Sequence, residues 1–371
     1  QVEKAMALLT PTLKMDALSD CDLIIEAVFE LMRIKKEIFT ALDSIAKKDA
    51  ILATNTSSFY VQQLADATQR PELVVGLHYF YHPAKNRLVE VIGHKGSSQS
   101  VLKAAWAFQE RVGKTPIASA DAPGFVVNRF FVPWLNEAVR IHEEGVSIAT
   151  IEKAAKESFG IGMGPFELMN VTGVPITLHA TASLGQSLGA FYDSAASLTP
   201  QVESKENWVL EGEVDADRTE EVADRLWGVV FHVATKLVDE GVSSAEDTDI
   251  GAKVGLRWPV GPFEKLNSVT AATGTTLAAK IEERYSLEPV QLLVEQAEHG
   301  TPFELKRVVL SVFDGVGTIT INRPDQLNAI DPETIAQLEA RFTEAEKNSD
   351  VRAIVIAGAG CNDPGARSSA A

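Results

Sequence analysis

Short apolar runs alternate with amphipathic stretches along the first third of the chain, and this alternation constrains the fold more than any other feature. Four runs are apolar and bounded by polar residues, which predicts buried strands: 22–28, 50–54, 73–78 and 88–92. Between the first two, apolar residues recur at helical spacing over 31–48. This order predicts a doubly wound, mostly parallel α/β sheet, which binds ligands at the carboxyl ends of its strands.

After Pro123 and Gly124 the pattern becomes helical, and it contains a repeat. The sequence Gly-Pro-Phe-Glu occurs at 164–167 and again at 261–264, and Glu-Gly-Val-Ser occurs at 144–147 and again at 240–243. Two copies of one helical unit are therefore predicted, in an all-α region separate from the sheet.

Two further stretches differ from the helical pattern. Between the copies, residues 194–218 are rich in Ser, Glu, Asp and Pro, which predicts a linker or an exposed loop. From Val308 two strand-like runs flank Asp314 and Gly315, which predicts a β-hairpin at the start of a third domain.

The composition excludes several classes of partner. A net charge of −17 disfavours nucleic acid and anionic membranes, which bind clustered Lys and Arg. The longest apolar run, 125–135, is interrupted by Asn128 and Arg129, so no membrane span is expected. The two cysteines, Cys21 and Cys361, make a disulfide framework implausible and favour a reducing compartment, so we expect a cytoplasmic protein.

His78 and Glu90 are the first candidates for catalysis, because each lies at or near the end of a predicted strand. A histidine can accept a proton at neutral pH, and a buried carboxylate can orient its ring, as a dehydrogenase requires. On the residues alone, the alternative of a structural histidine with Glu90 at the surface is favoured over the catalytic reading.

Other polar residues near the strand ends allow two readings each. The segment 55–58, Asn-Thr-Ser-Ser, could contact a ligand or cap the next helix. Glu30 and Lys35 could meet a ribose or pyrophosphate, or lie at a solvated helix start. His82 and His94 show no spacing typical of metal ligands, so no metal site is expected.

Five segments taken together resemble the L-3-hydroxyacyl-CoA dehydrogenase family in order and spacing: 22–28, 55–58, 76–80, 88–91 and 123–129. The resemblance covers roughly residues 1 to 300 and is specific because five independent segments agree. The segment 162–168 is similar to that family's helical dimerisation and substrate domain. With this resemblance, the catalytic reading of His78 and Glu90 becomes the favoured one.

The resemblance implies a role for each candidate residue. His78 would take the proton of the substrate's 3-hydroxyl, and Glu90 would hold and polarise it. Ser57 and Asn128 would hydrogen-bond the substrate oxygen. It also implies NAD as the cofactor, lined by Val28, Phe29, Glu30, Lys35 and Ser57. The second helical copy has Asp224 at the position of Asn128, so it is expected to support packing and the acyl pocket.

Two departures from the family pattern affect the cofactor. Tyr81 stands where the family usually has Asn, three residues after the catalytic His. The Gly-rich turn that holds the pyrophosphate, and the strands around it, are expected upstream of this sequence, so NAD affinity of the chain is expected to be poor.

The last part, 317–360, resembles the opening of the enoyl-CoA hydratase or crotonase family, through Asn322-Arg323-Pro324 and 327–330. The parent protein would then be bifunctional, although no hydratase activity is expected here. The expected domains are a truncated Rossmann-like NAD-binding domain, helical copies 1 and 2, and an incomplete crotonase-like α/β segment, at 1–119, 120–215, 216–302 and 303–371.

The predicted function is NAD-dependent oxidation of (S)-3-hydroxyacyl-CoA to 3-oxoacyl-CoA in fatty-acid β-oxidation, with an acyl-CoA substrate and a homodimer formed through the helical domains. Two alternatives stay open. One is a non-catalytic fragment that folds or dimerises without turnover. The other is a different NAD-linked dehydrogenase that acts on a hydroxy acid or a sugar, because the sheet alone would suit many substrates.

Overall fold

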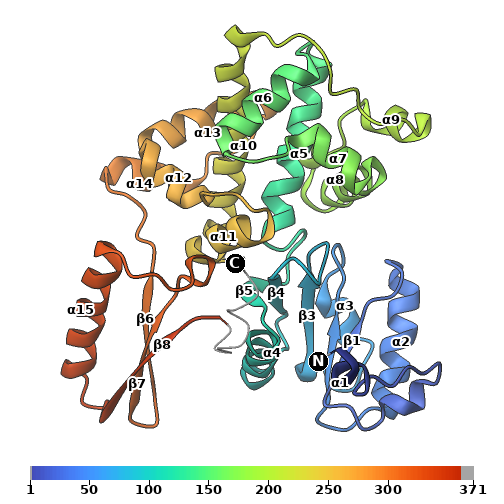
Figure 1. Cartoon of the computed structure of the whole chain (residues 1–371), viewed down its shortest axis with the longest axis vertical. Coiled ribbons are helices and arrows are strands. Elements are labelled where there is room, and N and C mark those ends of the chain that lie inside the picture. Colours follow the sequence, from blue (N-terminus) through green and yellow to red (C-terminus); the bar gives the residue numbers. More distant parts are fainter. Residues whose placement is uncertain (1, 361–371) are drawn as a thin grey trace.

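A computed structural model of the chain describes residues 2–360. Figure 1 shows a large helical part above two separate sheets, one formed by the N-terminal third and one near the C-terminus. This arrangement matches the predicted order of an α/β domain, an all-α region and a second α/β segment.

Among the described residues, the first sheet has the strand order β1-β2-β3-β4-β5, and all neighbours are parallel except β3 and β4. Its strands are β1 (Leu23–Glu26), β2 (Ile51–Thr54), β3 (Val74–Tyr79), β4 (Leu88–Gly93) and β5 (Thr115–Ala120). The four predicted strands are confirmed. β5 was not predicted because its sequence, Thr-Pro-Ile-Ala-Ser-Ala, has no apolar run.

Helices cover both faces of this sheet. Its helical elements are α1 (Val2–Met6), η1 (Met15–Leu18), α2 (Met32–Ile45), α3 (Val61–Ala65), η2 (Pro71–Leu73) and α4 (Gln99–Arg111). Phe39 of α2 and Leu64 of α3 pack with Leu52 on one face, whereas Ala105 of α4 packs with Leu77 on the other. The sheet is therefore doubly wound, as the alternation of strands and helices predicted.

The helical part packs around two long helices, α5 and α10. Copy 1 contains α5 (Val127–Glu143), α6 (Ile148–Phe159), α7 (Pro165–Thr172), α8 (Val174–Leu188), η3 (Ala190–Tyr192) and α9 (Leu198–Ser204). Copy 2 contains η4 (Ala216–Arg218), α10 (Thr219–Asp239), α11 (Ala245–Ile250), η5 (Gly251–Gly255), α12 (Pro262–Val269), α13 (Ala271–Tyr285) and α14 (Gln291–His299).

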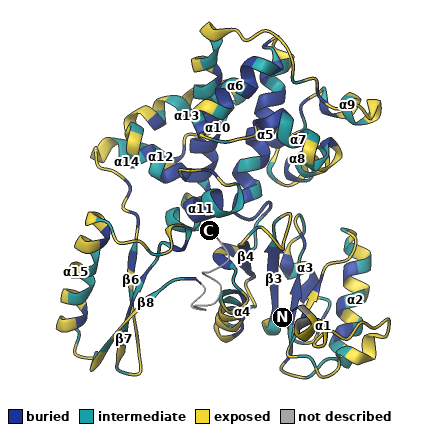
Figure 2. Cartoon of the chain, in the orientation of Figure 1, coloured by how far each residue is buried: buried dark blue, intermediate teal, exposed yellow. Residues whose placement is uncertain are grey.

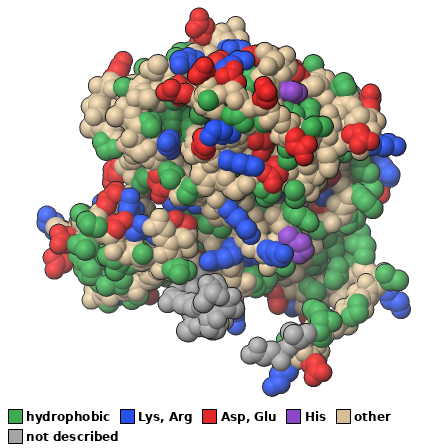
Figure 3. Space-filling model, turned by 45° about the horizontal axis from the view of Figure 1, so that its top comes forward, with side chains coloured by type: hydrophobic (Ala, Val, Ile, Leu, Met, Phe, Trp, Pro, Cys, Tyr) green, Lys and Arg blue, Asp and Glu red, His purple; other side chains and the backbone are tan. Residues whose placement is uncertain are grey.

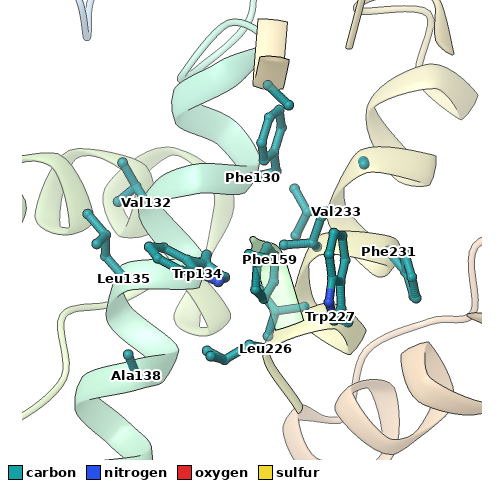
Figure 4. Packing of buried hydrophobic residues seen from close by; sticks show 14 of the residues in the cluster. Phe130, Val132, Trp134, Leu135, Ala138, Phe159, Leu226, Trp227, Phe231 and Val233 are labelled. Carbon is teal, nitrogen blue, oxygen red and sulfur yellow. The ribbon is translucent and has the colours of Figure 1, made fainter. Parts of the chain in front are cut away.

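An aromatic core joins the copies. Phe159 of copy 1 stacks on Trp227 of copy 2 at 3.9 Å between ring centroids, and Trp134 lies edge-on to Phe159 at 5.4 Å (Figure 4). Aromatic pairs in these geometries add to the stability gained by burial alone. The two copies therefore share one core.

The predicted linker between the copies is partly helical, because 194–218 contains α9 and η4. Leu198 and Trp208 in this stretch are buried against the helical core. These two apolar residues are far apart among polar ones, so the sequence shows no helical periodicity here. The stretch was therefore predicted to be a linker or an exposed loop.

The second sheet has the order β6-β7-β8 among the described residues, with strands β6 (Val308–Phe313), β7 (Val316–Ile321) and β8 (Ala353–Gly358). η6 (Pro324–Gln326) and α15 (Pro332–Lys347) follow β7. Asp314 and Gly315 both adopt positive φ, as a tight hairpin turn requires, so the predicted hairpin is confirmed.

The two sheets differ in how far their residues are buried (Figure 2). β3 and β4 of the first sheet are largely buried, whereas β8 of the second sheet and the helix α15 are mostly exposed or intermediate. Acidic, basic and apolar side chains are mixed on the face in Figure 3. Within residues 2–360, no helix combines the length and the hydropathy needed to cross a bilayer.

Candidate active site

His78 and Glu90 face each other across the only antiparallel strand pair of the first sheet, within residues 2–360. His78 of β3 and Glu90 of β4 are register partners, and their Nδ1 and Oε2 atoms lie 2.6 Å apart. The His78 side chain is 6% exposed and that of Glu90 is fully buried. The alternative that placed Glu90 at the surface is therefore wrong.

The second carboxylate oxygen of Glu90 is held by the start of α5. Its Oε1 accepts hydrogen bonds from the backbone N–H groups of Val126 at 3.1 Å and Val127 at 2.8 Å. Free N–H groups at the start of a helix, with the positive end of its dipole, are a favourable setting for a carboxylate. Glu90 is therefore fixed from two sides, by a ring nitrogen and by two amides.

The other ring nitrogen of His78 faces a serine. His78 Nε2 lies 3.1 Å from the Oγ of Ser57, which is exposed at the end of β2. Because Nδ1 donates its hydrogen to Glu90, Nε2 keeps a lone pair that can accept a proton. The ring is thus buried, while its basic nitrogen lies next to an exposed hydroxyl.

The loop that carries Ser57 is tied to two neighbouring strand ends. Glu30 accepts hydrogen bonds from the Thr56 hydroxyl and from the backbone N–H groups of Ser57 at 3.0 Å and Ser58 at 3.2 Å. Asn55 Oδ1 accepts the N–H of Tyr79, directly after His78, at 2.9 Å. Segment 55–58 therefore positions the serine and the histidine together.

Lys35, which the sequence predicted as a cofactor contact, pairs with two carboxylates in the structure. Its side chain is 1% exposed, and its Nζ pairs with Glu26 at 2.8 Å and Glu30 at 3.1 Å. Lys35 offsets the charges of these two carboxylates, one of which holds the Ser57 loop. Its contact with NAD stays a prediction.

The residues next to Ser57 suit the nicotinamide end of NAD. Val28 and Phe29, at the carboxyl end of β1, are 40% and 80% exposed, so an apolar surface lies open at the same sheet edge. Such a surface beside polar groups is what an aromatic ring of a cofactor requires. Val28, Phe29, Glu30 and Ser57 are thus compatible with the cofactor positions that the resemblance implied.

Asn128 and Tyr81 are less constrained. Asn128 directly follows Val127 in the first turn of α5 and is half-buried, and its side chain makes no hydrogen bond within the described residues. Tyr81 is 81% exposed. Asn128 is therefore close in sequence to the amides that hold Glu90, with an amide group available to a ligand.

The remaining histidines of this domain have structural or surface positions. His94 bonds Gln62 and the carbonyl of Pro71, and His82 accepts the N–H of Ala84. Within residues 2–360 no group of three His, Cys, Asp or Glu residues is arranged to hold a metal ion.

Two features of the site could not be found from the sequence pattern. The Val126 and Val127 amides are backbone donors, and the role of Asn55 is to hold a backbone N–H. The only signal was position, because each lies at an element boundary where free backbone groups need partners.

A separate groove of about 550 Å³ lies away from this site, between α4, β5 and the turn before α11. It is lined by Val91, which projects to the opposite face of β4 from Glu90. Its lining does not include His78 or Ser57, so the chemistry of the His78–Glu90 pair belongs to the other side of the sheet.

Comparison with known families supports the same assignment along the chain. The model for the 3-hydroxyacyl-CoA dehydrogenase NAD binding domain matches residues 1–122, and that for the C-terminal domain matches 124–208 and again 222–303. The enoyl-CoA hydratase/isomerase model matches 316–363. The second match of the C-terminal model agrees with the internal repeat.

Individual proteins agree with these family matches. The fatty acid oxidation complex subunit alpha of Shewanella halifaxensis is 31% identical over 334 residues, and that of Shewanella amazonensis is 32% identical over 335. Each alignment covers 81% of this chain and 47% of the relative. The chain therefore spans about half the length of these relatives.

Solved structures show the same fold. The 3-hydroxybutyryl-CoA dehydrogenase of Escherichia coli K12 superposes with a TM-score of 0.74 at 21% identity, covering 80% of this chain and 86% of that one. The (S)-3-hydroxybutyryl-CoA dehydrogenase PaaH1 of Ralstonia eutropha gives 0.53 at 30% identity, covering 55% and 72%. With both family domains matched in order, the chain belongs to the 3-hydroxyacyl-CoA dehydrogenase family.

Proposed function

We propose that the site oxidises the 3-hydroxyl of a (S)-3-hydroxyacyl-CoA thioester to a 3-oxo group, with His78 as the general base. The observation that carries this proposal is the continuous hydrogen-bonded series from Ser57 through His78 and Glu90 to the start of α5. It places a basic nitrogen beside an exposed hydroxyl and fixes the far side of the ring.

In this reaction the hydroxyl proton leaves to His78 Nε2 as the C–H bond at C3 breaks. Bound NAD supplies the acceptor for the hydride that leaves C3. Glu90 Oε2 stabilises the imidazolium that forms, and the Val126 and Val127 amides keep Glu90 in place. In the reverse direction His78 returns the proton to the substrate oxygen.

We assign the polar groups around His78 to the substrate and the apolar ones to the cofactor. Ser57 Oγ and the Asn128 amide would hydrogen-bond the substrate oxygen as it becomes a carbonyl. Val28 and Phe29 would contact the nicotinamide half of NAD, with Glu30 placing the Ser57 loop against it.

The nature of the thioester is supported by the family and by the C-terminal segment. Hydration of an enoyl-CoA gives the substrate that a 3-hydroxyacyl-CoA dehydrogenase oxidises. An enoyl-CoA hydratase/isomerase match at 316–363 on the same chain is therefore chemically consistent with β-oxidation. We propose that the whole protein carries both activities.

We also propose a cytoplasmic homodimer formed through the helical domains, within the four boundaries predicted from the sequence. The cytoplasmic part rests on the small number of cysteines. For the dimer, Val171 and Ile176 of copy 1 expose 64% and 63% of their surface. Light scattering of the purified chain tests the dimer, because a monomeric mass at micromolar concentration would contradict it.

The experiment that tests the activity follows NADH oxidation with acetoacetyl-CoA. It compares this 371-residue chain with a chimera that adds the residues of the Shewanella halifaxensis subunit that precede the aligned region. Turnover by the chimera with acetoacetyl-CoA but not with free acetoacetate supports the proposal. Equal turnover of the free acid favours a hydroxy-acid dehydrogenase, and NADH binding without turnover favours the non-catalytic alternative.

A further inference from the structure

The two helical copies wind the same segment differently. Aligning the two Gly-Pro-Phe-Glu sequences places Gly251 of copy 2 opposite Ala154 of copy 1. Ala154 lies inside the regular helix α6, whereas Gly251 begins η5, a single π-helical turn. π-Turns are rare and occur frequently at functional sites. Copy 2 therefore departs from copy 1 at one defined place.

Gly251 packs directly against the two residues that flank Glu90. A Cβ atom on Gly251 would lie 2.8 Å from Val127 Cγ2 and 3.1 Å from Ile117 Cδ1. Val127 donates its N–H to Glu90 Oε1, and Ile117 is the register partner of Glu90 in the β4–β5 ladder. A side chain at position 251 would push apart the elements that hold the carboxylate.

The other end of the π-turn contacts the strand that carries Glu90. The carbonyl of Gly255 accepts a hydrogen bond from Asn86 Nδ2 at 2.9 Å, and a Cβ on Gly255 would lie 2.5 Å from Leu88 Cδ2. Asn86 in turn accepts the N–H of Leu88, the first residue of β4. η5 thus touches β4, β5 and the start of α5 at once.

The π-turn is anchored from its outer side. Lys253 pairs with Glu264 of α12 at 2.6 Å and with Asp325 of η6 at 3.0 Å, and its side chain is 10% exposed. Because both partners are on other elements, the turn is held between the catalytic sheet and the rest of copy 2. A clash at Gly251 is therefore transmitted to Val127 and not relieved by movement of the turn.

We infer that the π-turn of copy 2, Gly251–Gly255, is a positioning element for Glu90, with Gly251 as the residue that permits the close contact with Val127 and Ile117. The expected loss of kcat rests on the proposed function. The expected weakening of the hydrogen bonds from Val126 and Val127 to Glu90 does not. Copy 2 then contributes to the dehydrogenase site through backbone packing, without a side chain in it.

The test combines a hydrogen-exchange measurement with kinetics on Gly251→Ala. We expect faster amide exchange in the peptide that contains Val126 and Val127, because the added methyl separates these amides from Glu90. When Gly251→Ala is introduced into the chimera described above, we expect kcat for acetoacetyl-CoA reduction to fall about 10- to 100-fold. This is the range that small misplacements of catalytic groups produce. The KM for NADH should stay within about twofold of the original.

Two variants provide matched comparisons. Gly274→Ala in α13 introduces a Cβ 2.1 Å from Leu266 Cδ2, away from the sheet, so it should lower stability and leave kcat and exchange at 126–127 unchanged. Val127→Ala combined with Gly251→Ala removes the methyl group nearest the clash, so it should recover most of the lost kcat. If Gly251→Ala does not fold, Gly255→Ala takes its place, since the clash there is with the flexible end of Leu88.

The outcomes separate this inference from the proposed function. Unchanged exchange at 126–127 in a folded Gly251→Ala protein would overturn the inference, as would faster exchange with an unchanged kcat. An equal loss of kcat in Gly274→Ala would also overturn it, because the effect would then be a general loss of stability. If the chimera without further substitutions shows no turnover, the proposed function fails. The exchange result still decides whether the π-turn holds the Val126 and Val127 amides against Glu90.

Discussion

The two helical copies share their internal framework and differ in what they hold. In copy 1 Glu152 caps the start of α7 through Phe166 N at 2.8 Å, and in copy 2 Asp249 caps α12 through Phe263 N at 2.7 Å. Asn170 clasps the backbone of Trp208 as Asn267 clasps that of Phe303. The buried polar contacts that define the unit are therefore the same in both.

The copies diverge where they meet the first sheet. The α5 helix of copy 1 begins next to Glu90 and supplies two amides to it, whereas α10 of copy 2 begins with an additional turn and places Asp224 near Lys280 at 3.7 Å. Copy 2 reaches the sheet through η5 and α11 instead. A duplicated unit can thus keep its core and change its function through the few residues at one end.

The largest difference between the copies should appear at Asn128 and Asp224. Asn128→Ala should lower kcat for acetoacetyl-CoA reduction about 10- to 100-fold, because an amide donor to the developing oxyanion is lost. Asp224→Ala should leave kcat unchanged, since its exposed contact is with Lys280. Steady-state kinetics of the two variants check this, and a comparable loss in both would remove the functional distinction between the copies.

The next prediction concerns a hydrogen bond that a side chain of α6 in copy 1, and one of α11 in copy 2, accepts from a neighbouring extended segment. Thr150 of copy 1 accepts the N–H of Asp215, and Asp247 of copy 2 accepts the N–H of Ala118 in β5. Burial, with a smaller contribution from the charge of Glu246, raises the pKa of Asp247 to about 7. A carboxyl whose pKa is raised on folding stabilises the fold in its protonated form, so its contribution is lost as the pH rises towards 7.

Between pH 5 and pH 8 this linkage lowers the free energy of unfolding as the pH rises, and because Asp247 lines the open groove and is only partly buried, solvent reduces the size of the effect. Asp247→Asn keeps an acceptor for the Ala118 amide and does not titrate, so the variant should lose less stability than the original protein over this range. Thermal unfolding at both pH values measures the difference. Parallel pH dependences in the two proteins would show that Asp247 is not the group responsible.

A smaller effect tests the shared framework. Asn170→Ala and Asn267→Ala each remove two hydrogen bonds to a backbone segment, so each should lower the free energy of unfolding by about 1 to 2 kcal/mol. Denaturant unfolding of both variants measures the two losses. Losses that differ by more than twofold would mean that the copies do not use this clasp equivalently.

The smallest effect lies at the turn after the second helix of each copy. Gly160 of copy 1 and Arg257 of copy 2 occupy equivalent left-handed positions, with φ of 64° and 60°. A glycine adopts this conformation without strain, so Arg257→Gly should stabilise the protein by up to about 1 kcal/mol. Gly160→Ala should destabilise it by at least that amount, and a stabilising Gly160→Ala would contradict the equivalence.

The sequence was sufficient for the parts of the fold that repeat a simple pattern. The strands from Leu23 to Gly93 and the helix Met32–Ile45 were predicted within a few residues, because buried strands and amphipathic helices have distinct periodicities. The β5 strand and α9 were missed because their sequences have no apolar run and no helical periodicity.

The candidate site divides in the same way. The positions of His78, Glu90 and Ser57 near strand ends made them candidates, and the family resemblance made the catalytic reading the favoured one. The structure brings these three together. The amides of Val126 and Val127, the pairing of Lys35 with two glutamates, and the contact of Gly251 could not be predicted. These depend on backbone groups, on burial and on close approach, which residue identities do not encode locally.

NADH oxidation with acetoacetyl-CoA tests the role of His78, when it is measured for the chimera beside its His78→Gln and Glu90→Gln variants. We expect His78→Gln to lower kcat about 100-fold or more, because the proton donor and acceptor is lost. Glu90→Gln should also lower kcat, with NADH affinity kept in both. A His78→Gln protein that binds both ligands and turns over at the original rate would contradict the central claim.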